Sequence, residues 1–221
     1  MSSKQQINEI VRTAMLNYNY KKAIQDIEKI LKKHPILRDE QRLCDLGMLY
    51  DHQAMVEKNV LKRKEYEKTA FKLYREILTI NPGSMYDSYA LWGIGRIWLH
   101  RKNKKALKYA KEAAVLTKKM TGKAGGMLLN VGLVYDELGN YKQAERWYLK
   151  TIKEDPGQLG LYINLTTLYF KYRRLDRLKK ILPTLKKLYE KEPDQFKQTK
   201  WGEFINGKIK EMYLKIKIKS K

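Results

Sequence analysis

The 221-residue sequence has little of what catalytic, metal-binding and disulfide-stabilised proteins depend on. Its one cysteine, Cys44, excludes an intramolecular disulfide, which is typical of proteins from a reducing compartment. The three histidines, His34, His52 and His100, stand far apart, and no serine or cysteine lies in a recognisable nucleophile motif. We therefore predict a non-enzyme without catalytic residues, cofactor or metal, in the cytoplasm or, as the alternative, the nucleus.

Long apolar runs are missing as well. The first segment, MSSKQQINEIVRTAM, carries charged and polar residues where a secretory signal needs an unbroken apolar core. No window of the sequence approaches the roughly 18 apolar residues of a membrane-spanning helix. We expect neither export nor membrane spanning.

Acidic residues are scarce relative to basic ones, with 24 Asp and Glu against 47 Lys and Arg and a net charge of +23. Such a charge attracts acidic proteins, nucleic acid or anionic membrane surfaces, although a solvated lysine-rich surface is the plainer explanation. The excess is largest near the C-terminus, where residues 171–221 hold 17 basic and 6 acidic residues. We expect an acidic partner.

What the sequence does have is tyrosine, with 16 copies, and a repeated pattern. Residues 125–156 carry it most plainly, and its members are Leu128, Val131, Gly132, Tyr135, Gly139, Tyr141, Ala144, Tyr148 and Pro156. This pattern resembles the tetratricopeptide family, whose repeats are helix-turn-helix units. Gly132 and Ala144 allow the two helices to cross closely, and Pro156 ends the second helix.

Four further copies follow the same template, with Val11, Gly47, Gly95 and Thr166 in the place of Gly132. The spacings of 36, 48, 37 and 34 residues lie near the family period, except for the second. The resemblance implies an all-α, right-handed superhelical solenoid of about five units with a C-terminal capping helix. We place the units at about 4–38, 40–84, 86–122, 125–158 and 159–193.

Three segments depart from the regular repeat. Residues 51–66 lie in the long second unit, where we expect extended helices that project as a basic knob, with an inserted loop as the alternative. Pro183 should kink the last repeat helix. Residues 194–214 have apolar residues at helical spacing and predict the capping helix, whereas residues 215–221 alternate and should fray into a basic tail.

The resemblance also implies a concave groove lined by the first helix of each unit. By helical phase, Gly93 and the following residues should face this groove: Arg12, His52, Tyr89, Arg96, His100, Asn130, Asn164 and Lys171. Asn130 and Asn164 are equivalent in successive repeats, and the family uses such asparagines to hold an extended peptide by its backbone. A carboxamide suits this because it both donates and accepts a hydrogen bond.

The basic residues are expected outside the groove. Those we single out on the knob, the capping helix and the tail are Lys62, Arg63, Lys64, Lys208, Lys210, Lys215, Lys217 and Lys219. The resulting hypothesis is an adaptor or scaffold that binds an extended peptide in its groove and an acidic partner on its exterior. The alternative is a sequence-nonspecific RNA- or DNA-binding protein that uses the lysine-rich surface. The oligomeric state stays open.

Overall fold

The structure, a computed structural model, describes residues 2–218. Within that range the chain is built from α-helices joined by short turns, with one short 3₁₀ helix and no strand. The predicted all-α fold is confirmed. The helices form two compact units, Met1–Met127 and Leu128–Lys221, each with its own packed interior.

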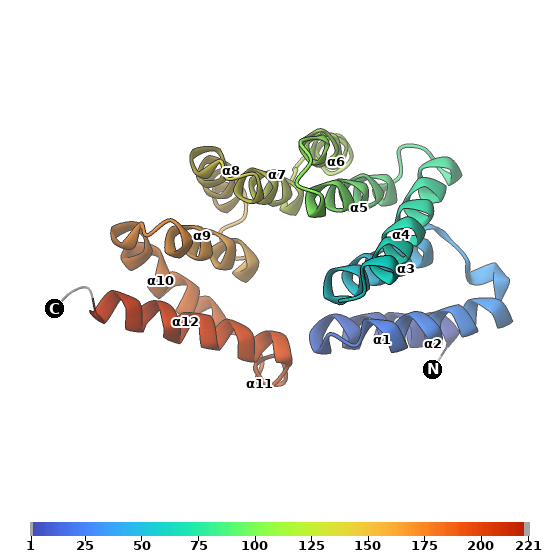
Figure 1. The fold of residues 1–221 in the computed structure, drawn as a ribbon, viewed down its shortest axis with the longest axis horizontal. Helices are drawn as coiled ribbons and strands as arrows, with labels where there is room; N and C mark the ends of the chain where they lie inside the picture. The colour runs from blue at the N-terminus through green and yellow to red at the C-terminus, as the bar shows by residue number, and fades with distance from the viewer. Residues whose placement is uncertain (1, 219–221) are drawn as a thin grey trace. The chain divides into compact units, whose positions relative to one another are not determined.

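The first unit consists of three helical hairpins (Figure 1). Its helices are α1 (Ser3–Asn17), α2 (Tyr20–Lys33), α3 (Glu40–Val56), α4 (Val60–Ile80), α5 (Met85–His100) and α6 (Lys105–Thr121), with the 3₁₀ helix η1 (Pro35–Leu37) after α2. Each hairpin pairs consecutive helices, and α2 packs on α3 as α4 packs on α5. The helices α3 and α5 therefore each contact the second helix of their own hairpin and that of the preceding one.

Local sequence signals explain where several of these helices begin. Ser2 and Gln5 form a capping box at the start of α1, and the Asp39 side chain accepts a hydrogen bond from the backbone N–H of Arg42 in α3. Asn59 caps α4 by accepting from the N–H groups of Leu61 and Lys62. Residues 57–59 alone join α3 to α4, so the extra length of the second hairpin lies in its helices.

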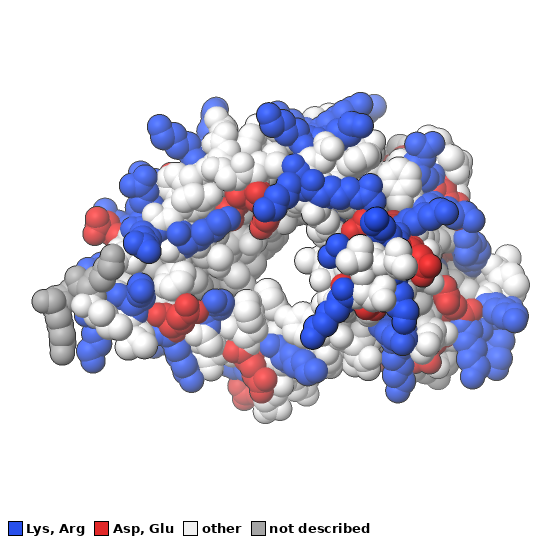
Figure 2. All heavy atoms as spheres, in the orientation of Figure 1, with Lys and Arg blue, Asp and Glu red and all other residues white. Residues whose placement is uncertain are grey.

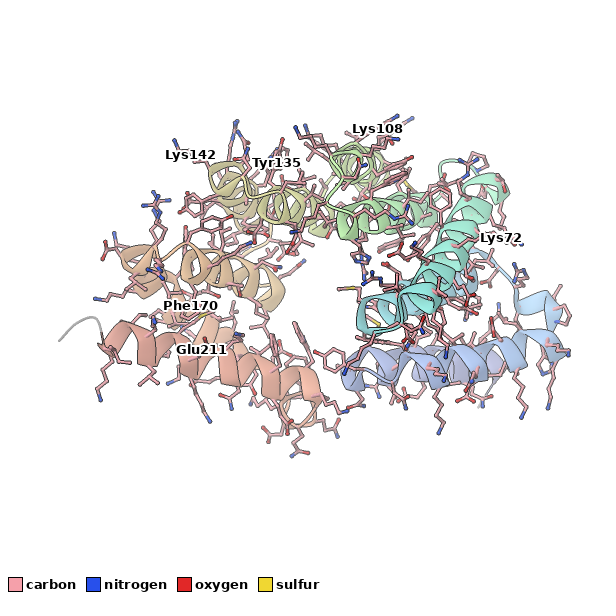
Figure 3. The ribbon with its side chains drawn as sticks, viewed as in Figure 1. Lys72, Lys108, Tyr135, Lys142, Phe170 and Glu211 are labelled. Atoms are coloured by element: carbon pink, nitrogen blue, oxygen red, sulfur yellow. The ribbon has the colours of Figure 1, made fainter. Side chains whose placement is uncertain are left out.

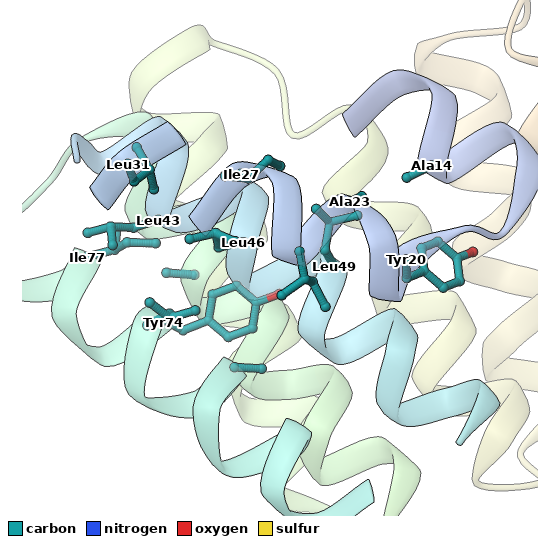
Figure 4. Packing of buried hydrophobic residues seen from close by; sticks show 14 of the residues in the cluster. Ala14, Tyr20, Ala23, Ile27, Leu31, Leu43, Leu46, Leu49, Tyr74 and Ile77 are labelled. Atoms are coloured by element: carbon teal, nitrogen blue, oxygen red, sulfur yellow. The ribbon is translucent and has the colours of Figure 1, made fainter. Parts of the chain in front are cut away.

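Tyr74 of α4 is central to the packing of the first unit (Figure 4). A Cβ atom built on Gly47 would lie 2.7 Å from Cε1 of Tyr74, and one built on Gly93 would lie 2.2 Å from its Cζ. The ring therefore occupies space that only glycine leaves free on both α3 and α5. The assignment of Gly93 to an open groove was wrong, because α5 packs on α4 as well as on α6 and has two buried sides.

The second unit holds the remaining helices, which are α7 (Gly126–Glu137, its first two residues in the first unit), α8 (Tyr141–Glu154), α9 (Leu159–Lys171), α10 (Leu175–Glu190), α11 (Asp194–Lys197) and α12 (Lys200–Ile218). Within this unit α9 packs on α8 and α10, and α12 packs on α10. The crossing of α7 and α8 depends on glycine, since a Cβ atom at Gly132 would lie 2.6 Å from Cδ1 of the buried Tyr148. The helix α10 continues through the exposed Pro183.

The C-terminal helix α12 is longer than the sequence predicted. It runs to Ile218, so the expectation that residues 215–218 fray was wrong. Ile209 and Met212 are buried in the core of the second unit, and Ile216 packs against the same core one turn later. This spacing of three and four residues keeps one side of the helix against the core beyond residue 214. The rest of the predicted tail, residues 219–221 with Lys219, lies outside the described residues.

Candidate binding surfaces

A polar cluster joins α3 to α5 in the first unit. The carboxylate of Asp51 is fully buried, and its Oδ2 lies 2.9 Å from Nε of Arg96 and its Oδ1 3.6 Å from Nδ1 of His100. Burial raises the pKa of Asp51, while the charges of Arg96 and His100 oppose that rise. The cluster therefore holds Arg96 in a fixed position at the surface of the two helices.

His52 belongs to the same cluster. Its Nε2 lies 3.2 Å from Nη1 of Arg96, and its ring stacks on Tyr20 at 5.2 Å between centroids. Burial, together with the positive charges of Arg96 and His100, lowers the pKa of His52 to about 3. The ring is therefore neutral near pH 7 and accepts a hydrogen bond from Arg96.

The structure thus brings together three of the predicted groove residues, His52, Arg96 and His100, but places Arg12 and Tyr89 elsewhere. Arg12 forms an ion pair with Glu9 on α1, at 2.8 Å, and both side chains are exposed. Tyr89 is exposed on α5 beside the ring of Tyr86. Sequence reasoning missed Asp51, and the available signal was an acidic residue directly before His52.

In the second unit, a polar surface lies on α7 and α9. Nζ of Lys171 at the end of α9 lies 2.8 Å from Oδ1 of Asp136 on α7. Asn164, almost two turns before Lys171, donates one hydrogen bond from Nδ2 to the carbonyl of Gly160, at 3.0 Å, and Asn130 is half-buried on α7. Within residues 2–218 this is the one hydrogen bond of the Asn164 side chain, so its oxygen and its second N–H can bond another molecule.

The predicted basic residues are exposed or partly exposed wherever the structure describes them. Lys62, Arg63 and Lys64 lie in the first turns of α4 with no carboxylate partner among residues 2–218. Lys208 pairs with Glu211 at 2.9 Å, while Lys210, Lys215 and Lys217 are exposed on α12. Basic side chains are spread over the visible faces of both units (Figure 2). Figure 3 labels Lys72, Lys108 and Lys142, which lie on exposed sides of α4, α6 and α8.

A cavity of about 590 Å³ lies where α3 ends, α4 begins and α5 ends. Its lining consists of Ala54, Met55, Arg63, Lys64, Glu67, His100 and Arg101. The buried carboxylate of Glu67 holds Arg101, with Nη2 of the guanidinium 2.9 Å from Oε2. Sequence reasoning found Arg63 and Lys64 but not Arg101 or Glu67, because their pairing joins two different hairpins.

Three features of the described residues bear on what these surfaces can do: the thiol, the metal-ligating side chains and the hydropathy of the helices. Burial raises the pKa of the Cys44 thiol to about 12, which leaves it a poor nucleophile near neutral pH. No group of three or more metal-ligating side chains comes together within the described part of the chain. Among its helices, none has the length and apolar character needed to cross a bilayer.

No family model and no curated protein matches the sequence. Solved structures do match. A thermophilic TPR protein from Thermus thermophilus superposes over 96% of this chain and 100% of its own, with a TM-score of 0.67 and 16% identity. The chain has the tetratricopeptide fold. PilF of Pseudomonas aeruginosa (TM-score 0.55, 15% identity, 83% of this chain and 77% of its own) and MamA of Desulfovibrio magneticus (0.50, 15%, 87% and 98%) are also similar.

The tetratricopeptide fold accounts for the residues that carried the resemblance. Gly47, Gly95 and Gly132 are buried on the first helices of their hairpins, and Ala70, Ala106 and Ala144 are fully buried on the second helices. These small residues recur because the helices of each tetratricopeptide hairpin cross closely. The candidate surfaces lie on other sides of the same helices, so the packing of the fold does not determine which residues they carry.

Proposed function

We propose that the protein is a non-catalytic interaction adaptor that holds an extended peptide segment across α7 and α9, with its basic exterior free for an acidic partner. The tetratricopeptide fold supports a general scaffold role, but the specific ligand depends on the surface residues. The observation that carries the proposal is Asn164, which is anchored by one hydrogen bond to its own helix and presents the rest of its carboxamide. Lys171, fixed by Asp136, lies on the same helix.

The peptide ligand is held through its backbone. Asn164 accepts from a peptide N–H through Oδ1 and donates to a peptide carbonyl through Nδ2, so it pairs with any residue type in an extended segment. Asn130 is the equivalent position on α7, and Lys171 adds a preference for an acidic side chain nearby. A backbone-directed site of this kind fits a scaffold that accepts related segments from one class of partner.

The test selects binding peptides from a displayed random library on the full chain and measures their affinity by fluorescence anisotropy. Asn164→Ala removes two hydrogen bonds of about 1 kcal/mol each, so peptide affinity should fall roughly fivefold to thirtyfold. Asn206→Ala, at a half-buried asparagine on α12, is the matched control and should leave the affinity unchanged. Equal affinities for the two variants would exclude the α7–α9 surface as the peptide site.

A second candidate function is nonspecific nucleic-acid binding. It is favoured by Lys62, Arg63 and Lys64, which have no acidic partner among the residues that the structure describes, and by the basic faces in Figure 2. Lysine and arginine contacts to phosphates would release counterions and give affinity without sequence preference. Most of the aromatic rings that the structure describes are packed in the two repeat cores, which leaves few stacking platforms for unpaired bases.

A further inference from the structure

The turn between α3 and α4 presents apolar side chains to solvent. We call Met55, Val56, Val60 and Leu61 the hairpin tip; their exposed fractions are 58%, 53%, 50% and 72%. They end one helix and begin the next, separated only by residues 57–59, so all four lie at the same end of this hairpin. Large apolar side chains grouped in this way, with charged neighbours, mark an interaction surface.

Four cations surround the tip. Lys58, Lys62, Arg63 and Lys64 are exposed and have no carboxylate partner within residues 2–218. The one acidic residue between positions 55 and 64 is Glu57, whose Oε1 accepts a hydrogen bond from the N–H of Asn59. The tip therefore combines an apolar patch with a local net charge of +3, from four basic residues and one acidic residue.

The cavity described above is lined by Met55 of this patch and by Arg63 and Lys64 of the surrounding cations. Arg101 contributes a third cation that the buried Glu67 holds in place. With one carboxylate, Glu67, and three cations, Arg63, Lys64 and Arg101, the cavity carries a net charge of +2, which attracts the negatively charged phosphate of a lipid headgroup. Arginine side chains bind phosphate oxygens through two parallel N–H groups.

We propose that the hairpin tip docks on an anionic lipid bilayer, with Val56, Val60 and Leu61 entering the boundary between headgroups and acyl chains. The cavity takes the phosphate of a lipid headgroup. Apolar side chains flanked by lysines are suited to this boundary, because the cations stay with the headgroups while the side chains leave water. The proposal goes beyond peptide binding and uses a different unit of the chain.

An apolar hairpin tip surrounded by cations favours a lipid surface over the other anionic partners. A nucleic acid would satisfy the cations, but its phosphate backbone offers no apolar contact to Val56 or Leu61, and the tip has no aromatic ring for a base. A phosphorylated peptide would fill the cavity and still leave the apolar side chains of the tip in water unless it carried a matching apolar segment. A bilayer offers both anionic headgroups for the cations and an apolar region for the side chains of the tip.

Vesicle sedimentation with the full chain tests the proposal. We expect binding to vesicles of phosphatidylcholine with phosphatidylserine as about a third of the lipid, and little binding to phosphatidylcholine alone. Leu61→Asp should lower the partition coefficient at least about tenfold, because the leucine no longer leaves water. The double variant Arg63→Glu/Lys64→Glu should lower it more than about tenfold, since each lost cation is worth roughly a factor of five.

Matched controls in the same unit separate the tip from general effects. Ile36→Asp changes the most exposed large apolar residue, on η1, and Lys21→Glu/Lys22→Glu makes the same charge reversal at the exposed start of α2. Both controls should bind vesicles several-fold better than the tip variants, and circular dichroism should show equal helicity for all. Equal losses in tip and control variants would overturn the proposal in favour of diffuse charge attraction.

Further measurements distinguish a lipid surface from inorganic phosphate, nucleic acid and phosphopeptides as the ligand. Binding that Arg63→Glu/Lys64→Glu abolishes but Leu61→Asp leaves intact would overturn insertion of the tip, and competition by inorganic phosphate would then identify a phosphate site alone. Loss of oligonucleotide or phosphopeptide binding in the charge variant, without vesicle binding by the unmodified chain, would overturn the lipid assignment. Asn164→Ala should leave vesicle binding unchanged, so failure of the peptide proposal and failure of this one are separately visible.

Discussion

At the scale of single residues, the ion pair of Asp51 and Arg96 stands out because it places a charged carboxylate in the protein interior. The carboxylate is fully buried, so its desolvation must be offset by the guanidinium 2.9 Å away and by His100. Removing one partner of such a pair leaves an uncompensated charge in the interior, which costs far more than the intact pair contributes. The pair was invisible to helical phase alone, because the burial of Asp51 depends on α5, which lies more than 30 residues further along the chain.

We predict that Arg96→Met lowers the free energy of unfolding by about 3 kcal/mol at pH 7, measured by urea denaturation followed by circular dichroism. Burial raises the pKa of Asp51, and without Arg96 that rise is less opposed. A raised carboxyl pKa in the folded state adds stability at low pH that is lost as the pH rises through it. The deficit of the variant should therefore shrink between pH 7 and pH 5. Arg12→Met, which breaks only an exposed pair, should show no measurable loss, and an equal deficit at both pH values would contradict the assignment.

At the scale of helices, much of the fold follows from short-range pattern. The small residues at Gly47, Gly132 and Ala144, repeated near a fixed period, predicted the paired helices, and the tetratricopeptide fold confirms them. The features that could not be predicted depend on contacts with helices outside the same hairpin. Gly93 faces Tyr74 of the preceding hairpin rather than a groove, and α12 extends past residue 214 because Ile216 finds the core of α10 and its neighbours.

The candidate sites also contain some residues that helical phase predicted and others that it did not. Helical phase grouped His52, Arg96 and His100, since their positions on the first helices are set by the repeat. It could not supply Asp51, Glu67 or Arg101, because ion pairs between hairpins depend on rotamers and on the crossing of α3, α4 and α5. A repeat pattern fixes which side of a helix is buried, but the partners of a buried charge come from distant sequence.

Close helix crossing gives a direct prediction at this scale. Gly93→Ala should lower the free energy of unfolding by about 1 to 3 kcal/mol, since its Cβ would lie 2.2 Å from Cζ of the buried Tyr74 and neither group has room to move. Gly207→Ala is the matched control on an exposed side of α12, where a Cβ meets no atom within 4 Å. That substitution should raise stability by about 0.5 to 1 kcal/mol because alanine favours the helix. Thermal or urea unfolding of both variants measures the contrast, and a destabilised Gly207→Ala with a neutral Gly93→Ala would contradict the packing.

At the scale of the whole molecule, the net charge of +23 must be separated from the specific surfaces. A charge spread over both units attracts every polyanion, so binding to one anionic ligand by itself identifies no site. The proposed peptide site and a phosphate-binding exterior should differ in how they depend on salt. Hydrogen bonds from the neutral carboxamide of Asn164 would be little affected by salt, whereas contacts of basic side chains to phosphates would be screened.

We therefore predict that the affinity for a labelled random oligonucleotide falls steeply between about 50 and 200 mM salt, by roughly a thousandfold if six or more phosphates are contacted. Asn164→Ala should not change this affinity, while Arg63→Glu/Lys64→Glu should weaken it and reduce the slope against salt. The affinity of a selected peptide should change much less over the same range. If instead the oligonucleotide bound tightly at high salt and no peptide bound, nucleic acid would be the principal ligand. Contacts other than phosphate neutralisation would then carry the binding, because charge attraction alone does not survive screening at high salt.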